Sequence, residues 1–69
     1  MVEVFKTNVQ EKKEATELIK VLLQYFPGTR INLDLHDCDK ILRVEGDSIE
    51  AHQVIKLVKS KGFYCCMLE

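Results

Sequence analysis

The side chains that could bind a soft metal ion are few and lie in two short stretches of the sequence. His36 and Cys38 belong to the polar segment 36–39, and Cys65 and Cys66 are neighbours near the last residue. Thiolates and imidazoles are the ligands that copper(I) and zinc prefer. His36 and Cys38 can approach each other across a turn, so they are the candidate metal ligands. Cys65 and Cys66 cannot chelate together in a strand, because adjacent side chains point to opposite faces. We expect one of the two in the core and the other on the open face.

The sequence offers little for other kinds of chemistry. Asp34, Asp37 and Asp39 could attract a hard cation, but their segment lacks the glycine and the terminal glutamate of a calcium loop. His36 and His52 fall on different predicted elements, and His52 is expected to face solvent near the start of a helix. No glycine-rich phosphate loop is present, and no Ser/His/Asp or Cys/His arrangement can be placed in a pocket. We therefore expect neither an enzyme nor a bound cofactor.

The composition is that of one small globular domain spanning residues 1–69. The chain is 46% hydrophobic and 30% charged, and its formal net charge of −1 argues against a nucleic-acid-binding protein. Lys56, Lys59 and Lys61 are interpreted as a solvated helix face. No apolar stretch precedes the first charge at Glu3 and no run reaches transmembrane length, so we expect no signal peptide and no membrane insertion. The odd number of cysteines, three, and the absence of a CxxC motif predict reduced thiols in a cytoplasmic protein.

The first part of the sequence predicts a strand followed by a helix. Residues 2–9 form the strand, with Phe5 and Thr7 on one face and Val2 and Val4 on the other. Apolar residues at three- and four-residue steps then predict an amphipathic helix over 10–26. The residues of this stripe are Ala15, Leu18, Ile19, Leu22 and Phe26.

Capping and helix-breaking residues predict where this helix begins and ends. Asn8 is the expected N-cap, and Glu11 three residues later completes a capping-box pattern. Pro27 and Gly28 end the helix, because proline cannot continue it and glycine accepts a left-handed conformation.

The second part predicts a hairpin, a helix and a closing strand. Ile31, Leu33 and Leu35 alternate with polar residues, and after the polar turn 36–39 Leu42 and Val44 alternate in the same way. Gly46 breaks the second strand. Residues 47–50 (DSIE) form another capping-box pattern before a second helix that ends at Gly62, and residues 63–68 form a short strand. The apolar stripe of this helix is Ala51, Val54, Ile55 and Val58.

The order β-α-β-β-α-β predicts an α+β domain with the ferredoxin-like sandwich. Two helices would cover one face of a four-stranded antiparallel sheet. In this topology the loop after the first strand, the turn 36–39 and the turn 61–63 lie at the same end of the molecule.

This pattern resembles the heavy-metal-associated (HMA) domains of copper chaperones and metal-transporting P-type ATPases. The resemblance is carried by residues 5–9 (FKTNV), which end the first strand, by residues 42–46 (LRVEG), which end the third, and by residues 61–63 (KGF) before the fourth. It covers the whole chain and implies the same fold. It also implies a copper(I) site in the loop after the first strand, where the family holds two thiolates in a CxxC motif.

The chain departs from the family at this metal loop. Counted from the first strand, the two cysteine positions fall on Gln10 and Lys13, and counted back from the helix stripe they fall on Glu11 and Glu14. No cysteine, histidine or methionine occurs between residues 7 and 23. Because amide, carboxylate and ammonium groups cannot replace a thiolate pair, the family's metal site does not carry over.

Three functions remain open. The first is an HMA-like domain without the CxxC motif that acts as a protein-interaction or regulatory module for an unknown protein partner. The second is a heavy-metal-binding or transport domain with a displaced site that involves Cys38 and His36. The third is a small structural or regulatory protein that forms a homodimer through Val2 and Val4 on an open sheet face. For the first function, the resemblance implies docking at the metal-loop end, and the expected surface is Gln10, Glu11, Lys12, Lys13, Glu14 and Lys61.

Overall fold

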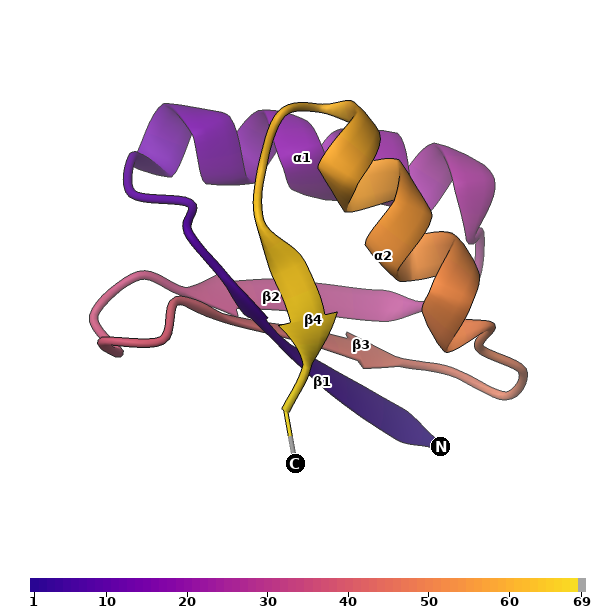
Figure 1. Ribbon diagram of the computed structural model, residues 1–69. Coiled ribbons are helices and arrows are strands. Elements are labelled where there is room, and N and C mark those ends of the chain that lie inside the picture. Colours follow the sequence, from indigo (N-terminus) through magenta and orange to yellow (C-terminus); the bar gives the residue numbers. More distant parts are fainter. Residues whose placement is uncertain (69) are drawn as a thin grey trace.

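The architecture is a sheet covered on one side by two helices in a computed structural model that describes residues 1–68. The elements are β1 (Val2–Thr7), α1 (Lys12–Tyr25), β2 (Arg30–Asp34), β3 (Ile41–Glu45), α2 (Ala51–Ser60) and β4 (Cys65–Met67). The four strands are ordered β2-β3-β1-β4, and each neighbouring pair is antiparallel. Both helices lie on the same face of the sheet (Figure 1). The predicted ferredoxin-like βαββαβ fold is confirmed.

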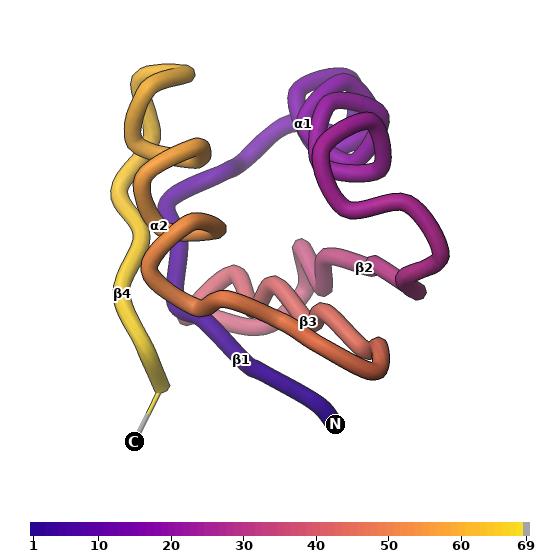
Figure 2. Tube along the Cα trace, turned by 90° about the vertical axis from the view of Figure 1, so that its right-hand side faces the viewer, coloured from indigo at the N-terminus to yellow at the C-terminus, as the bar shows by residue number. Residues whose placement is uncertain are grey.

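The core lies between the helix layer and the inner face of the sheet, the two layers that Figure 2 shows in a view turned by 90°. The register pairs Phe5 with Leu42, and both side chains are fully buried. Periods of two in the strands and of three or four in the helices bring the apolar side chains to this layer. The buried apolar residues are Phe5, Val9, Ala15, Leu18, Leu22, Leu42, Val44, Ile49, Val54, Val58 and Cys65.

Both helices begin later than their sequence patterns predict. The N-cap of α1 is Glu11 and not Asn8, and the Glu11 N–H donates to Glu14 Oε1 at 3.4 Å. The capping box of α1, formed by Glu11 and Glu14, therefore lies three residues later than the predicted box of Asn8 and Glu11. Asn8 does not cap the helix, because its side chain accepts the Tyr64 N–H. The N-cap of α2 is Glu50, without a side-chain capping hydrogen bond, so the capping box predicted over 47–50 is wrong.

Two strands are shorter than the sequence predicts, while both helices end before the expected glycines. β1 ends at Thr7 instead of residue 9, and β4 covers only Cys65–Met67 of the predicted stretch 63–68. Gly28 and Gly62 follow the two helices with φ of +82° and +93°, a conformation in which a side chain is strained. The predicted roles of these two glycines are therefore confirmed.

Candidate functional site

Three connections meet at one end of the sheet, as the sequence predicts. The N–H of Thr7, the last residue of β1, donates to the Asp39 carbonyl at 3.1 Å and so joins β1 to the hairpin turn. The N–H of Tyr64 donates to Asn8 Oδ1 at 2.8 Å and joins the same loop to the start of β4. These two hydrogen bonds explain why the loop after β1 has a defined position.

The buried hydroxyl of Thr7 stabilises this end of the molecule by two hydrogen bonds to backbone groups. The hydroxyl donates to the Lys40 carbonyl at 2.7 Å and accepts from the Val9 N–H at 3.3 Å. Within residues 1–68, Thr7 is the one buried polar residue, with 6% of its surface exposed. Because both backbone groups are satisfied by one hydroxyl, the chain can leave β1 and still bury Val9 completely.

The surface expected for partner binding is fully open to solvent. Gln10 to Glu14 and Lys61 are all exposed. The two possible pairs of CxxC positions, Gln10 with Lys13 and Glu11 with Glu14, therefore carry only exposed amide, ammonium and carboxylate groups. These groups do not bind soft ions in the way that a thiolate pair does.

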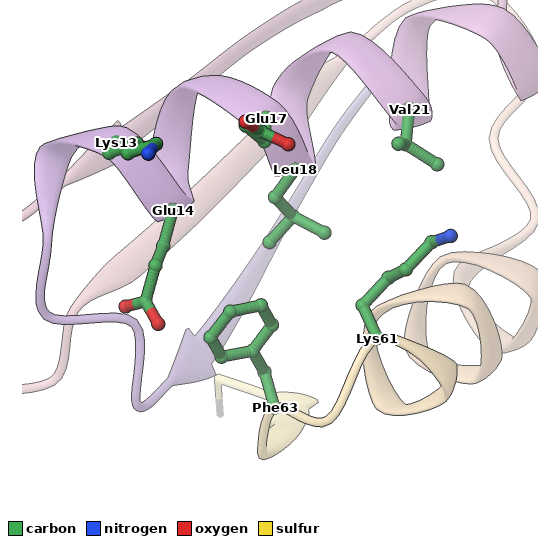
Figure 3. Close-up of a pocket in the computed structure, with 7 residues that line it drawn as sticks. All are labelled: Lys13, Glu14, Glu17, Leu18, Val21, Lys61 and Phe63. Carbon is green, nitrogen blue, oxygen red and sulfur yellow. The ribbon is translucent and has the colours of Figure 1, made fainter.

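A groove of about 310 Å³ lies between α1 and the turn that follows α2 (Figure 3). Its apolar part consists of the buried Leu18 with the half-buried Val21 and Phe63. Glu14 and Lys61 lie on opposite sides of the Phe63 ring. The residues that line the groove are Lys13, Glu14, Glu17, Leu18, Val21, Lys61 and Phe63. The groove thus offers an apolar floor between an acidic and a basic side chain.

Part of this groove was not predicted from the sequence. Lys13, Glu14 and Lys61 belong to the expected surface, but Glu17, Val21 and Phe63 do not. The spacing of Glu14, Glu17 and Val21 places them on one side of α1 and is a usable signal. Phe63 could not be placed in this way, because its contact with α1 depends on how the turn after α2 approaches the helix.

Three neighbouring side chains of the hairpin turn, Asp37, Cys38 and Asp39, form a group of possible metal ligands. A ligand atom from each of Asp37, Cys38 and Asp39 lies within 4.8 Å of the others, and His36 is outside this group. Asp37 Oδ1 accepts the Asp39 N–H at 2.8 Å, and Asp34 Oδ1 accepts the His36 N–H at 3.0 Å. The carboxylates therefore help to shape the turn, and His36 also lines the groove between α1 and β2.

Cys65 and Cys66 lie on opposite faces of β4, which confirms the prediction. Cys65 is the buried one, with 1% of its surface exposed, and burial raises the pKa of its thiol from 9.0 to about 11. Cys66 Sγ lies 3.0 Å from the Tyr64 hydroxyl oxygen, and this hydrogen bond is the main reason why the pKa of Tyr64 is raised. All three cysteines are free thiols.

The open face of the sheet mixes apolar and charged side chains. Val2 and Val4 lie on this face, with 46% of Val2 exposed and Val4 half-buried. Their partners in β3 are Glu45 and Arg43, which are both exposed. This face is therefore less apolar than the two valines suggest. His52 is exposed on α2, as expected.

Comparisons of the chain with protein-family models, with curated proteins and with solved structures gave no match. A functional proposal therefore rests on the geometry of the groove and of the hairpin turn. Neither described helix has the length and apolar character needed to cross a bilayer.

Proposed function

We propose that the protein is a non-enzymatic interaction or regulatory module of the HMA type that lacks the family's metal site. The observation that carries the proposal is the apolar groove beside the β1–α1 loop, at the end where HMA domains hold their metal. The absence of soft ligands between residues 7 and 23 supports a role without metal in this loop. The free thiols support a cytoplasmic location, because a reducing compartment maintains them.

The groove favours a partner segment with one apolar side chain between a basic and an acidic residue. The apolar side chain would contact Leu18, Val21 and Phe63, which line the floor. The partner's basic group would face Glu14 and its acidic group would face Lys61, since these two lie on opposite sides of Phe63 (Figure 3). Burial of one such side chain contributes about 1.5–3 kcal/mol and each exposed ion pair about 0–1 kcal/mol. Because association also costs translational and rotational freedom, an isolated short peptide should bind weakly, with a Kd of about 1 mM or above.

Three peptides of equal length test this partner chemistry. Each carries a central leucine, flanked by one lysine and one glutamate, by two lysines or by two glutamates. In NMR titrations we expect the mixed peptide to shift the amide signals of Leu18, Val21 and Phe63 and to bind about three- to tenfold more tightly than the others. Val21→Glu should abolish these shifts, whereas Lys20→Glu, which adds the same group to an exposed position outside the groove, should not. Equal binding of the three peptides, or no shift at the groove, would contradict the proposal.

The alternative function is a heavy-metal-binding or transport domain with a displaced site at Cys38 and His36. The group of Asp37, Cys38 and Asp39 is the observation that favours it, although His36 is not a member. An anaerobic titration of the reduced protein with copper(I) or zinc, against a competing chelator, separates the two functions. The interaction module should show no tight binding. Submicromolar binding that Cys38→Ser abolishes would establish the alternative.

A further inference from the structure

The strand β2 occupies an edge of the sheet and is open to pairing. In the order β2-β3-β1-β4 its only neighbour among residues 1–68 is β3. It is a regular strand of five residues, Arg30–Asp34, without proline. Natural sheets usually protect such edges with proline, bulges, lysines or a covering segment, because a free edge pairs readily with another strand. The described part of the chain places no strand beyond β2.

The sequence of β2 is complementary to itself when it is read in the opposite direction. Residues 30–34 are RINLD, and their exposure alternates between exposed and half-buried. In an antiparallel pair of two β2 strands centred on Asn32, Arg30 lies opposite the Asp34 of a second copy. Ile31 lies opposite the Leu33 of that copy on the inner face. Both opposite-charge and apolar cross-strand pairs stabilise antiparallel sheets.

An apolar groove runs beside this edge and extends the complementary surface. It measures about 410 Å³ and lies between α1 and β2. Ile19 and Leu33 are half-buried in it, and Leu23, one helical turn beyond Ile19, is 40% exposed. Its lining residues are Lys12, Ala15, Thr16, Ile19, Asn32, Leu33, Asp34, Leu35 and His36. A second copy joined at β2 would bring its own α1 towards this surface.

We propose that two copies of this chain pair through β2, antiparallel and centred on Asn32, to form one continuous sheet with the two α1 helices on the same side. A twofold axis through this pairing makes the interface isologous, so that each Arg30–Asp34 contact occurs twice. This surface is separate from the groove proposed for a protein partner, which lies on the α2 side of α1. β2 and β4 are at opposite ends of the strand order, and Figure 2 shows them on opposite sides of the molecule. The dimer does not depend on the proposed function.

Charge reversal at the two ends of β2 tests the pairing. Arg30→Asp gives two aspartate–aspartate contacts in the dimer, and Asp34→Arg gives two arginine–arginine contacts. Each variant should weaken the dimer by about tenfold or more, because like charges directly opposite each other are destabilising. The variant with both changes restores two opposite-charge contacts and should dimerise like the wild type. A mixture of the two single variants should form a heterodimer, because a strand with aspartate at both ends then faces a strand with arginine at both ends.

Sedimentation equilibrium from micromolar to millimolar protein measures these dimer affinities. Since Arg30 also lies opposite Glu45 and Asp34 Oδ1 accepts the His36 N–H, circular dichroism and thermal unfolding of every variant check the fold. Asp34→Asn keeps an acceptor for this hydrogen bond and should weaken the dimer less than Asp34→Arg. Val2→Lys on the open face should leave the dimer intact.

A wild-type protein that stays monomeric over this concentration range overturns the proposal. A dimer that is retained in all the charge variants also overturns the proposal, because its contact does not involve Arg30 and Asp34. A dimer that only Val2→Lys disrupts overturns it as well, because its contact lies on the open face of the sheet. Failure of the mixed single variants to associate has the same consequence, provided that the wild type dimerises and the two variants are folded.

Discussion

Asn8 Oδ1 accepts the backbone N–H of Tyr64 at 2.8 Å, so one side chain joins the end of β1 to the start of β4. We expect Asn8→Ala to lower the free energy of unfolding by about 0.5–1.5 kcal/mol, since the bond is lost at an exposed site. Asn8→Asp keeps an acceptor and should cost less. Urea unfolding of the three proteins measures the difference. Equal losses for Asn8→Ala and Asn8→Asp would show that this bond is not what stabilises the junction.

Thr7 should be more sensitive than Asn8 because its hydroxyl is buried. Thr7→Val keeps the shape but leaves the Lys40 carbonyl and the Val9 N–H without their partner. A buried unsatisfied group costs about 1–3 kcal/mol, so we expect a loss in that range in the free energy of unfolding. Thr7→Ser, which retains the hydroxyl, is the matched control. If Thr7→Val is as stable as the wild type, the hydroxyl contributes no net stability.

The stability of the fold should decrease at alkaline pH because of Cys65. Burial raises the pKa of this thiol from 9.0 to about 11, so the folded state favours the neutral form. Below pH 9.0 the thiol is protonated in both states, and its contribution is fully present. As the pH rises towards about 11, the unfolded chain loses the proton first and the free energy of unfolding falls.

Chemical unfolding at several pH values between 9 and 11 measures this dependence. Cys65→Ala should lose this part of the slope, whereas Cys66→Ala should keep most of it, because burial raises the pKa of Cys65 more than the charge of Cys66 does. A slope that is unchanged in Cys65→Ala would assign the alkaline destabilisation to other groups, such as the tyrosines and lysines.

Introduced cysteines test the proposed relation to HMA domains. Gln10→Cys combined with Lys13→Cys places two thiolates in the loop at the CxxC spacing, and both positions are exposed. We expect this variant to bind copper(I) tightly in a chelator competition, while the wild type does not. The pair Glu11→Cys and Glu14→Cys tests the other alignment. If neither variant binds copper(I), the loop does not correspond to the metal loop of that family.

The elements could be predicted because local patterns decide them. The apolar stripe of α1 contains Ala15, Leu18 and Leu22, and all three are buried in the core. The alternation in β2 and β3 likewise gives the hairpin. The first residue of α1 could not be predicted as well. Asn8 accepts the backbone N–H of the distant Tyr64 and does not cap α1, and only the tertiary structure decides between these two roles.

The candidate site could be predicted only in part, for a similar reason. The exposed polar and charged side chains at 10–14 and at Lys61 follow from the loop and the turn, which the topology brings to one end. The apolar floor needs Val21 and Phe63 to meet from different elements, and no local pattern reports that contact. His36 is close to Cys38 in sequence, and only the tertiary structure shows that it also lines the groove between α1 and β2.

We propose that the groove beside Phe63 selects a partner by an apolar side chain between opposite charges. The most direct measurement is the ratio of the affinities of the mixed-charge and two-lysine peptides for the wild type and for Lys61→Glu. We expect the wild type to prefer the mixed peptide by about three- to tenfold and Lys61→Glu to prefer the two-lysine peptide, because the second flank of the groove becomes acidic. An unchanged ratio in Lys61→Glu would contradict the claim.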